Sequence, residues 1–515
     1  MAHRLPCRTP LTIAVGSLLA VGHAQAAVIT VNTTADGPPG SMPGTCSLRS
    51  AIYSANEAYG YDACASGSAG ADEIAFDPDL AGSYIALTEG EIEISSGLTI
   101  TGPAPGAFGV LIGGSNASRI FNVQGGGSGG FEVILDSLAM LNGRTSQNNE
   151  PGGAVYVDSA DIRLSHSLIS GSATEGEYSP GGGLYVVEGD ATLTNSMVLA
   201  NATEELRSKG GGMHVDNGDA TLTSSMVSGN STAGSNAYGG GLSVLSGDAT
   251  LNESTVSGNS TMGPSAHGGG LRFGFSNSTL TNSTMSGNST AGELAHGGGV
   301  AVVAGGTELS NSTVSGNSTA GDDAYGGGLH AYDVDTTLTN STISGNSTEG
   351  GGAHGGGLYV RGSFVTERNA TLIQTTVAYN IATDGTDDVH RGDFATLTLS
   401  NSLIVQAGTG EESCNATADV HDNSLATDDS CTGAATVLSE IALDPLADNG
   451  GHTFTHALGA ASAARDAAGD CYATFEIDTD QRGQPRPGVG SDECDIGAFE
   501  YQVLDELFQD RFESP

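Results

Sequence analysis

The chain has 515 residues, of which 59 are Asp or Glu and 16 are Lys or Arg, so its formal net charge is −43. This acidity excludes nucleic acid as a partner, because such binding depends on basic side chains that neutralise phosphates. Only 37% of the residues are apolar and none is Trp, so a core must be narrow and long rather than spherical. Outside the N-terminus, no apolar run approaches the roughly 18 residues that a transmembrane helix needs.

Residues 1–26 have the pattern of a secretory signal peptide. Arg4 and Arg8 give a positive start, residues 11–21 form an apolar run too short to span a bilayer, and Ala-Gln-Ala provides a cleavage site. We therefore expect an exported protein whose mature chain begins directly after this segment. Cys7 lies in the positive part rather than at the cleavage point, which disfavours a lipid-anchored lipoprotein.

The mature chain keeps six cysteines: Cys46, Cys64, Cys414, Cys431, Cys471 and Cys494. An even number in an exported chain predicts three disulfides. Pairs that are close in sequence, 46/64, 414/431 and 471/494, are the natural choice among the connectivities that six cysteines allow. None shows the CxxC spacing of a zinc or redox site, so a zinc site is disfavoured.

Downstream of the first cysteines, a strict internal repeat fills the middle of the chain. After a first step of 30, glycine clusters recur every 29 residues, and their last members are Gly153, Gly183, Gly212, Gly241, Gly270, Gly299, Gly328 and Gly357. An asparagine column keeps the same spacing, with members Asn201, Asn230, Asn259, Asn288, Asn317 and Asn346. A fixed period of this kind indicates a stacked array of similar units.

Each unit divides into three expected strands, Gly-Gly-Leu-x-Val, Ala-Thr-Leu-Thr and Thr-Val-Ser-Gly-Asn, before an exposed Ser-Thr-Ala-Gly loop. No 3.6-residue apolar period is present, which argues against helical solenoids. Equivalent strands of successive units would stack in parallel at ~4.8 Å. The sequence therefore predicts an all-β fold, a right-handed parallel β-helix, because parallel crossovers are overwhelmingly right-handed.

The predicted segments are a signal peptide over 1–26, an N-terminal cap over 27–73, the β-helix over 74–405 with regular repeats over about 150–380, a C-terminal region over 406–502 and an acidic-aromatic tail over 503–515. In the cap, Leu48, Ile52 and Ala55 are spaced as one face of a short helix. Ser47 precedes them as an N-cap. This helix is expected to cover the open first coil. Extra residues near 361–368 predict a bulge in the repeat.

Two interpretations of the asparagine column remain open. As inward turn residues, stacked amides can form a hydrogen-bonded ladder along the core. As Asn-x-Ser/Thr sequences, the same residues match glycosylation acceptors. The strict spacing favours the ladder.

Rings and carboxylates form further columns. Tyr238, His267, His296, Tyr325 and His354 directly precede the glycine clusters. Three His residues in line are compatible with a metal site, but Tyr at two levels favours ring stacking. A column of turn carboxylates consists of Asp190, Asp219, Asp248 and Asp335. We favour solvated turns there and expect no cofactor, while Ca²⁺ is retained as an alternative ligand for this column.

An enzymatic site has one local candidate, the polar cluster Asp387, Asp388, His390 and Arg391. A glycoside hydrolase needs two carboxylates ~5–9.5 Å apart, and this loop combines acids with His and Arg. A lyase acting on anionic sugars is less compatible with the chain, because Lys209 is its only lysine and the strong acidity repels anions. A solvated loop is the favoured interpretation of the cluster.

Both flanks of the repeat resemble known families. The segment Cys46-Ser-Leu-Arg-Ser-Ala-Ile resembles the CSLREA-type N-terminal segment of exported bacterial β-helix proteins, with Ser50 where Glu is usual. Residues 443–501, which contain ADNGGHTFTHAL, TDQRGQPRP and CDIGAFEY, are similar to the choice-of-anchor Q domain. The repeats resemble those of polymorphic outer membrane proteins. The final FQDRFE is similar to an IFxDGFE-type tail, with Arg511 in place of Gly.

The resemblance implies an exported or surface-retained right-handed β-helix protein of a Gram-negative bacterium, and it transfers no catalytic residue. We expect a structural or adhesive protein that binds a carbohydrate or a surface protein at the outer membrane surface or outside the cell. The alternative is a secreted polysaccharide lyase or glycoside hydrolase on the same scaffold, although a fold alone does not determine an activity.

Overall fold

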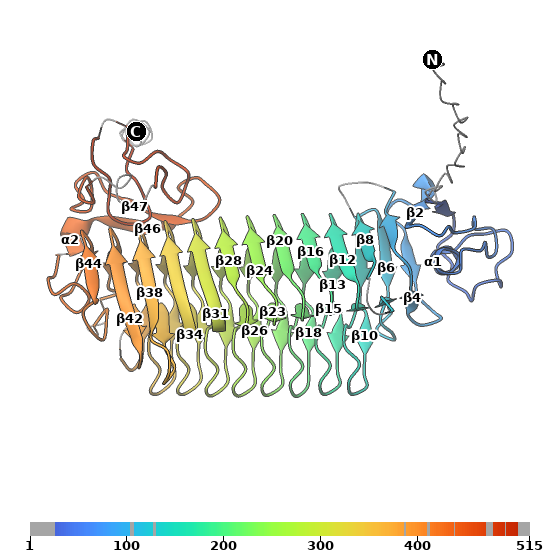
Figure 1. Cartoon of the computed structure of the whole chain (residues 1–515), viewed down its shortest axis with the longest axis horizontal. Coiled ribbons are helices and arrows are strands. Elements are labelled where there is room, and N and C mark those ends of the chain that lie inside the picture. Colours follow the sequence, from blue (N-terminus) through green and yellow to red (C-terminus); the bar gives the residue numbers. More distant parts are fainter. Residues whose placement is uncertain are drawn as a thin grey trace, which may run out of the picture.

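The computed structural model describes residues 26–103, 108–126, 130–385, 388–408, 412–436, 438–469, 477–489 and 491–502. It shows an elongated stack of β-coils with a small cap at one end and a loop-rich region beside the other (Figure 1). The predicted signal peptide, apart from Ala26, and the predicted tail lie outside the described residues. No helix within the described ranges is long and apolar enough to cross a membrane.

One regular coil contains four short strands. In the coil that begins at Leu242, they are β23 (Leu242–Leu245), β24 (Ala249–Asn252), β25 (Thr255–Ser257) and β26 (Ser260–Thr261). Equivalent strands of successive coils pair in parallel, so that Leu222 of β20 (Ala220–Thr223) lies opposite Leu251 of β24. The predicted stack of 29-residue coils is therefore confirmed.

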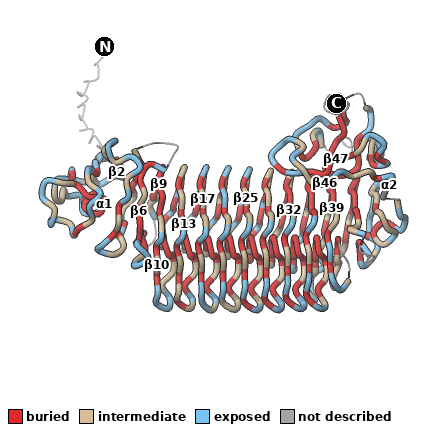
Figure 2. Tube along the Cα trace, turned by 180° about the vertical axis from the view of Figure 1, so that it is seen from behind, coloured by how far each residue is buried: buried red, intermediate tan, exposed pale blue. Residues whose placement is uncertain are grey.

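The coils form parallel sheets of 23, 13 and nine strands around a thin interior. Leu242, Leu251 and Val256 are completely buried in it, and Figure 2 shows buried residues along the whole stack. The fourth strand differs from the expected exposed loop. Thr261 is buried and its hydroxyl donates to the carbonyl of Ala266, 2.5 Å away, so the exposed loop begins after this strand.

A ladder of buried amides runs through the interior. Oδ1 of Asn288 accepts the backbone N–H of Asn259 at 3.0 Å and its Nδ2–H at 2.9 Å. Nδ2 of Asn288 also donates to the carbonyl of Val256 at 2.9 Å. The same side-chain bonds connect Asn201, Asn230, Asn259, Asn288, Asn317, Asn346 and Asn380. These amides are buried inside the stack and do not face solvent as glycosylation acceptors would.

The glycine clusters are explained by this ladder. Gly239 has a φ of +68°, a conformation that side-chain-bearing residues rarely adopt. A Cβ on Gly241 would lie 2.9 Å from Cγ of Asn259. From Gly183 to Gly357, the last glycine of each cluster therefore leaves the space that the amide of the same coil fills.

The N-terminal cap contains helix α1 (Leu48–Asn56), and Ser47 accepts the N–H of Ser50 as its N-cap. A disulfide joins Cys46 to Cys64. The parallel strands begin earlier than predicted, because β1 (Val28–Val31) already pairs with β2 (Asp72–Phe76). The helix therefore packs beside the first coil, while the strand before it belongs to the stack.

The stack also ends later than predicted. Strands β44 (Val420–Asp422) and β45 (Leu425–Ala426) add a further partial coil, which the disulfide Cys414–Cys431 closes. Cys494 is disulfide-bonded as well, and its expected partner Cys471 lies outside the described residues.

Beyond this coil, the C-terminal region contains α2 (Leu438–Ile441) and an antiparallel pair, β46 (Leu443–Ala447) and β47 (Thr455–Leu458). It folds back over the side of the last coils near β32 (Thr313–Ser315) and β39 (Thr376–Ala378) (Figure 2). Buried Gln481 fixes this arrangement, because its Nε2–H donates to the hydroxyl of Thr313 at 2.8 Å.

Replacement of one ladder residue tests this account of the fold. Asn288→Ala leaves two N–H groups of Asn259 without their acceptor in the interior and removes one donor from the carbonyl of Val256. We therefore expect a loss of about 4 kcal/mol in the free energy of unfolding. Asn252→Ala is the control, because Asn252 points outward from β24 where the neighbouring coils carry Thr. Urea unfolding followed by circular dichroism measures both variants. Equal losses would contradict the structural ladder.

Candidate functional site

Two columns of rings run side by side along one face of the stack, and we call them the ring columns. The first is Tyr238, His267, His296, Tyr325 and His354, the residues before the glycine clusters. The second column contains outward residues of the strands that follow these clusters: Tyr156, Tyr185, His214, His330, Tyr359 and His390. Neighbouring rings stack with centroids 4.6–5.8 Å apart.

The second ring column has a gap, where Ser243, Arg272 and Ala301 occupy successive levels. A cavity of about 300 Å³, the ring pocket, opens over Ala301. It is formed by β31 (Val300–Ser310), β34 (Leu329–Thr339), β37 (Leu358–Arg361) and the first ring column. The gap in the column of rings therefore leaves a concave site beside Ala301.

The hydrogen bonds of two imidazoles in this pocket define their tautomer. The backbone N–H of His296 donates to Nδ1 of His267, and that of Tyr325 donates to Nδ1 of His296, both at 3.0 Å. Burial lowers the pKa of His267 to about 3 and that of His296 to about 4. The rings are therefore neutral at pH 7, and because Nδ1 accepts, the ring proton is on Nε2.

The pocket combines ring surfaces with hydrogen-bond donors. Tyr325, Tyr332 and Tyr359 contribute hydroxyls, and Arg361 contributes a guanidinium. Within the described part of the chain, no carboxylate lines the ring pocket. Arg272 lies next to this region over the ring of Tyr238, 5.4 Å from its centroid. The pocket thus lacks the two carboxylates that a glycoside hydrolase uses.

The described members of the predicted polar cluster have separate contacts in the stack. Asp387 lies outside the described residues, and Asp388 is completely buried. Oδ1 of Asp388 accepts Nδ2–H of Asn380 at 2.9 Å, so this carboxylate continues the amide ladder. His390 stacks on His354 and Tyr359 in the ring columns.

The fourth member of the cluster, Arg391, forms an ion pair with Asp419 in the last coil. The interpretation of the cluster as a solvated loop was wrong for Asp388, because this side chain is buried and bonds to Asn380. Each described member takes part in coil-to-coil packing or pairing, and the catalytic interpretation of the cluster stays a prediction.

The column of turn carboxylates forms a chain of hydrogen bonds. Oδ1 of Asp190 accepts the backbone N–H of Asp219, and Oδ1 of Asp219 accepts that of Asp248, at 2.9 and 2.8 Å. Among the residues that the structure describes, no group of three or more His, Cys, Asp and Glu side chains is placed to hold a metal ion. Calcium binding at this column stays a hypothesis.

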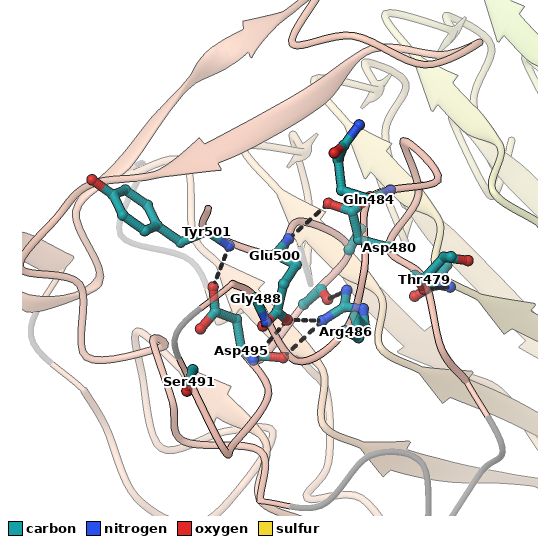
Figure 3. Close-up of polar contacts among 12 residues, drawn as sticks. Thr479, Asp480, Gln484, Arg486, Gly488, Ser491, Asp495, Glu500 and Tyr501 are labelled. Carbon is teal, nitrogen blue, oxygen red and sulfur yellow. Dashed lines mark hydrogen bonds and ion pairs between the residues drawn. The ribbon is translucent and has the colours of Figure 1, made fainter. Parts of the chain in front are cut away.

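Charged residues of the C-terminal region form a second buried cluster (Figure 3). Nη1 of Arg486 lies 2.8 Å from Oε2 of Glu500, and burial raises the pKa of Glu500 to about 7. The carboxylates of Glu500 and Asp495 accept backbone N–H groups of Gly488 and Tyr501 at 2.7 and 2.6 Å. These contacts tie irregular loops together, so we assign the cluster a structural role.

No protein-family model and no curated protein matches this chain. Among solved structures, it is similar to pectate lyase Pel9A with a TM-score of 0.35 and 12% identity, over 93% of this chain and 98% of that chain. It is also similar to the periplasmic alginate epimerase AlgG with a TM-score of 0.30 and 9% identity, over 64% of this chain and 84% of that chain. At these values, the likenesses carry no argument about the activity of this protein.

The sequence pattern revealed the first ring column but not the pocket. The available signal was Ala301, a small residue at a position where later units carry His330 and Tyr359. Ala301 indicates a pocket only if the second ring column lies beside the first, and the repeat spacing alone does not show this arrangement.

The pH dependence of stability tests the neutral imidazoles. The folded-state pKa of His296, about 4, is below the roughly 6.5 of an unfolded chain. The unfolded chain therefore binds more protons below pH ~6.5, and the contribution of His296 to stability falls by about 2 kcal/mol between pH 7 and pH 5. His296→Tyr should remove this part of the pH dependence.

Thermal unfolding between pH 5 and pH 7 measures the difference. Tyr fits the stack, because Tyr325 occupies the same position one coil later. His421→Tyr is the control, since His421 is exposed. An identical pH slope in wild type and His296→Tyr would show that the buried ring is not neutral in the folded protein.

Proposed function

We propose that the protein is an exported β-helix scaffold that binds an uncharged polysaccharide in the ring pocket, and so acts as an adhesive or structural component outside the cell or at its surface. The observation that carries this proposal is the gap at Ala301, beside which rings that carry N–H and hydroxyl donors line one cavity. Sugar hydroxyls accept such donors, and sugar C–H faces pack on apolar ring surfaces.

Electrostatics favours an uncharged ligand. The net charge of −43 repels polyanions over long distances. Within the pocket, the guanidinium of Arg361 is already 3.3 Å from the carboxylate of Asp393. This pairing reduces the charge that the guanidinium could offer to an anionic sugar.

Export is supported by the disulfides at both ends of the stack, Cys46–Cys64 and Cys414–Cys431. The resemblance of the flanking segments to exported bacterial β-helix proteins supports a location at or beyond the outer membrane surface. Binding is favoured over cleavage because the described lining of the ring pocket holds no carboxylate that could act as acid or nucleophile.

Affinity electrophoresis in gels containing neutral polysaccharides tests the proposal. Tyr332→Ala should weaken binding about tenfold, which corresponds to ~1.4 kcal/mol, because it removes one ring wall of the pocket. Tyr178→Ala is the matched control, since Tyr178 is 45% exposed and Tyr332 is 37% exposed, but Tyr178 lies outside the pocket. Equal retardation of both variants would refute the pocket as the binding site.

The same samples are assayed for new reducing or unsaturated sugar ends. If the wild type and Tyr178→Ala release such ends and Tyr332→Ala does not, the protein is an enzyme and the proposal of a binding scaffold is wrong. Retardation without any release supports the scaffold.

A further inference from the structure

A second cavity lies where the C-terminal region meets the last coils. This interdomain pocket has a volume of about 510 Å³. On the side of the stack, its wall includes Ser315, Ser344 and Tyr379, and on the side of the C-terminal region it includes Leu446 and His456. The ring pocket shares none of these residues, so the two cavities are separate sites.

A serine and a histidine are hydrogen-bonded in this wall. Nε2 of His456 lies 2.8 Å from Oγ of Ser344, and Nδ1 of His456 lies 2.7 Å from the backbone carbonyl of Asp444. A carbonyl can only accept, so Nδ1 bears the proton. In the neutral ring Nε2 is then the acceptor, and the hydroxyl of Ser344 donates to it.

This arrangement matches the geometry of an activated nucleophile: a hydroxyl within hydrogen-bond reach of a base that a third group orients. Burial lowers the pKa of His456, so the ring is neutral at pH 7 and its Nε2 can accept a proton. Both side chains are almost completely buried, yet both line the pocket. A substrate in the pocket would therefore contact this hydroxyl.

The repeat supplies an internal comparison for Ser344. It belongs to a column of equivalent serines, Ser228, Ser257, Ser286, Ser315 and Ser344. Among the described residues, Ser344 is the member of this column that bonds to a histidine. The histidine comes from β47, 112 residues later in the chain, so the pair forms only when the C-terminal region folds back.

We propose that Ser344 and His456 form a catalytic dyad that hydrolyses uncharged carboxylic esters with a small apolar acyl group. Leu443, Pro445 and Leu446 give the pocket its apolar wall, which fits an acyl chain. The hydroxyls of Ser315 and Tyr379 line the same pocket. They are the donors available to the oxyanion.

In the first step, Oγ of Ser344 bonds to the acyl carbon while its proton moves to Nε2 of His456. The carbon–alkoxy bond then breaks, and the alcohol leaves with the proton from the ring. Water next attacks the acyl-serine and gives its proton to Nε2. The Oγ–acyl bond breaks, Oγ takes the proton back, and the carboxylic acid is released.

Labelling of the full mature protein with a fluorophosphonate probe, together with hydrolysis of p-nitrophenyl acetate and butyrate, tests the dyad. We expect labelling and turnover in the wild type, loss of both in Ser344→Ala, and wild-type values in Ser286→Ala, the control from the same column. His456→Gln should lower turnover about a hundredfold or more. Absence of labelling in the wild type, or labelling that persists in Ser344→Ala, would overturn the proposal.

Two cysteine variants distinguish a catalytic role of His456 from a packing role. If His456 acts as a base towards residue 344, Ser344→Cys should react with iodoacetamide at pH 7 faster than Ser286→Cys, because the imidazole favours the thiolate. Thermal unfolding of both variants checks that the C-terminal region stays docked. With docking intact, an equal or slower rate for Ser344→Cys would show that the hydrogen bond is only structural. A faster rate supports the dyad whatever the stability of Ser344→Ala.

Discussion

The buried amide ladder holds each coil in register with the next. Oδ1 of Asn288 accepts two N–H groups of Asn259, and its Nδ2–H bonds to the carbonyl of Val256. A shift of one residue between coils would break these bonds in a dry interior, where unsatisfied groups are costly. From Gly183 to Gly357, the last glycine of each cluster provides the space for the amide. Because this register is fixed inside the stack, outward residues also lie above their equivalents.

Because equivalent residues lie above one another, the same residue type in successive coils forms a continuous surface. Rings at equivalent positions stack with centroids 4.9–5.8 Å apart, and imidazolium rings at this spacing would repel one another. Burial therefore favours neutral histidines such as His267 and His296. The levels without a ring, which end at Ala301, therefore leave a pocket.

The repetitive part of the fold could be predicted from the sequence because its determinants are local and periodic. Apolar, glycine and asparagine columns define the coil, and the spacing of Leu48, Ile52 and Ala55 predicts the helix that the structure contains. The contact of Asp388 with the amide ladder was not predicted, because Asp388 follows Gly357 by 31 residues and not by 29, although its carbonyl takes the equivalent backbone position.

The two pockets could not be predicted, because they depend on contacts that no local pattern encodes. Ser344 meets His456 across 112 residues, and Gln481 meets Thr313 across 168. Irregular C-terminal loops, tied by buried charges such as Arg486 and Glu500, place these residues. The path of these loops over the stack depends on contacts between segments that are far apart in the chain.

The docking of the C-terminal region has a consequence for the length of the molecule. Gln481 binds the hydroxyls of Thr313 and Thr342, which continue a column that includes Thr255 and Thr284 in earlier coils. Insertion or loss of one unit between the N-terminal cap and these coils would leave the docking surface unchanged. The number of units therefore acts as a ruler that sets the distance between the two ends in steps of ~4.8 Å.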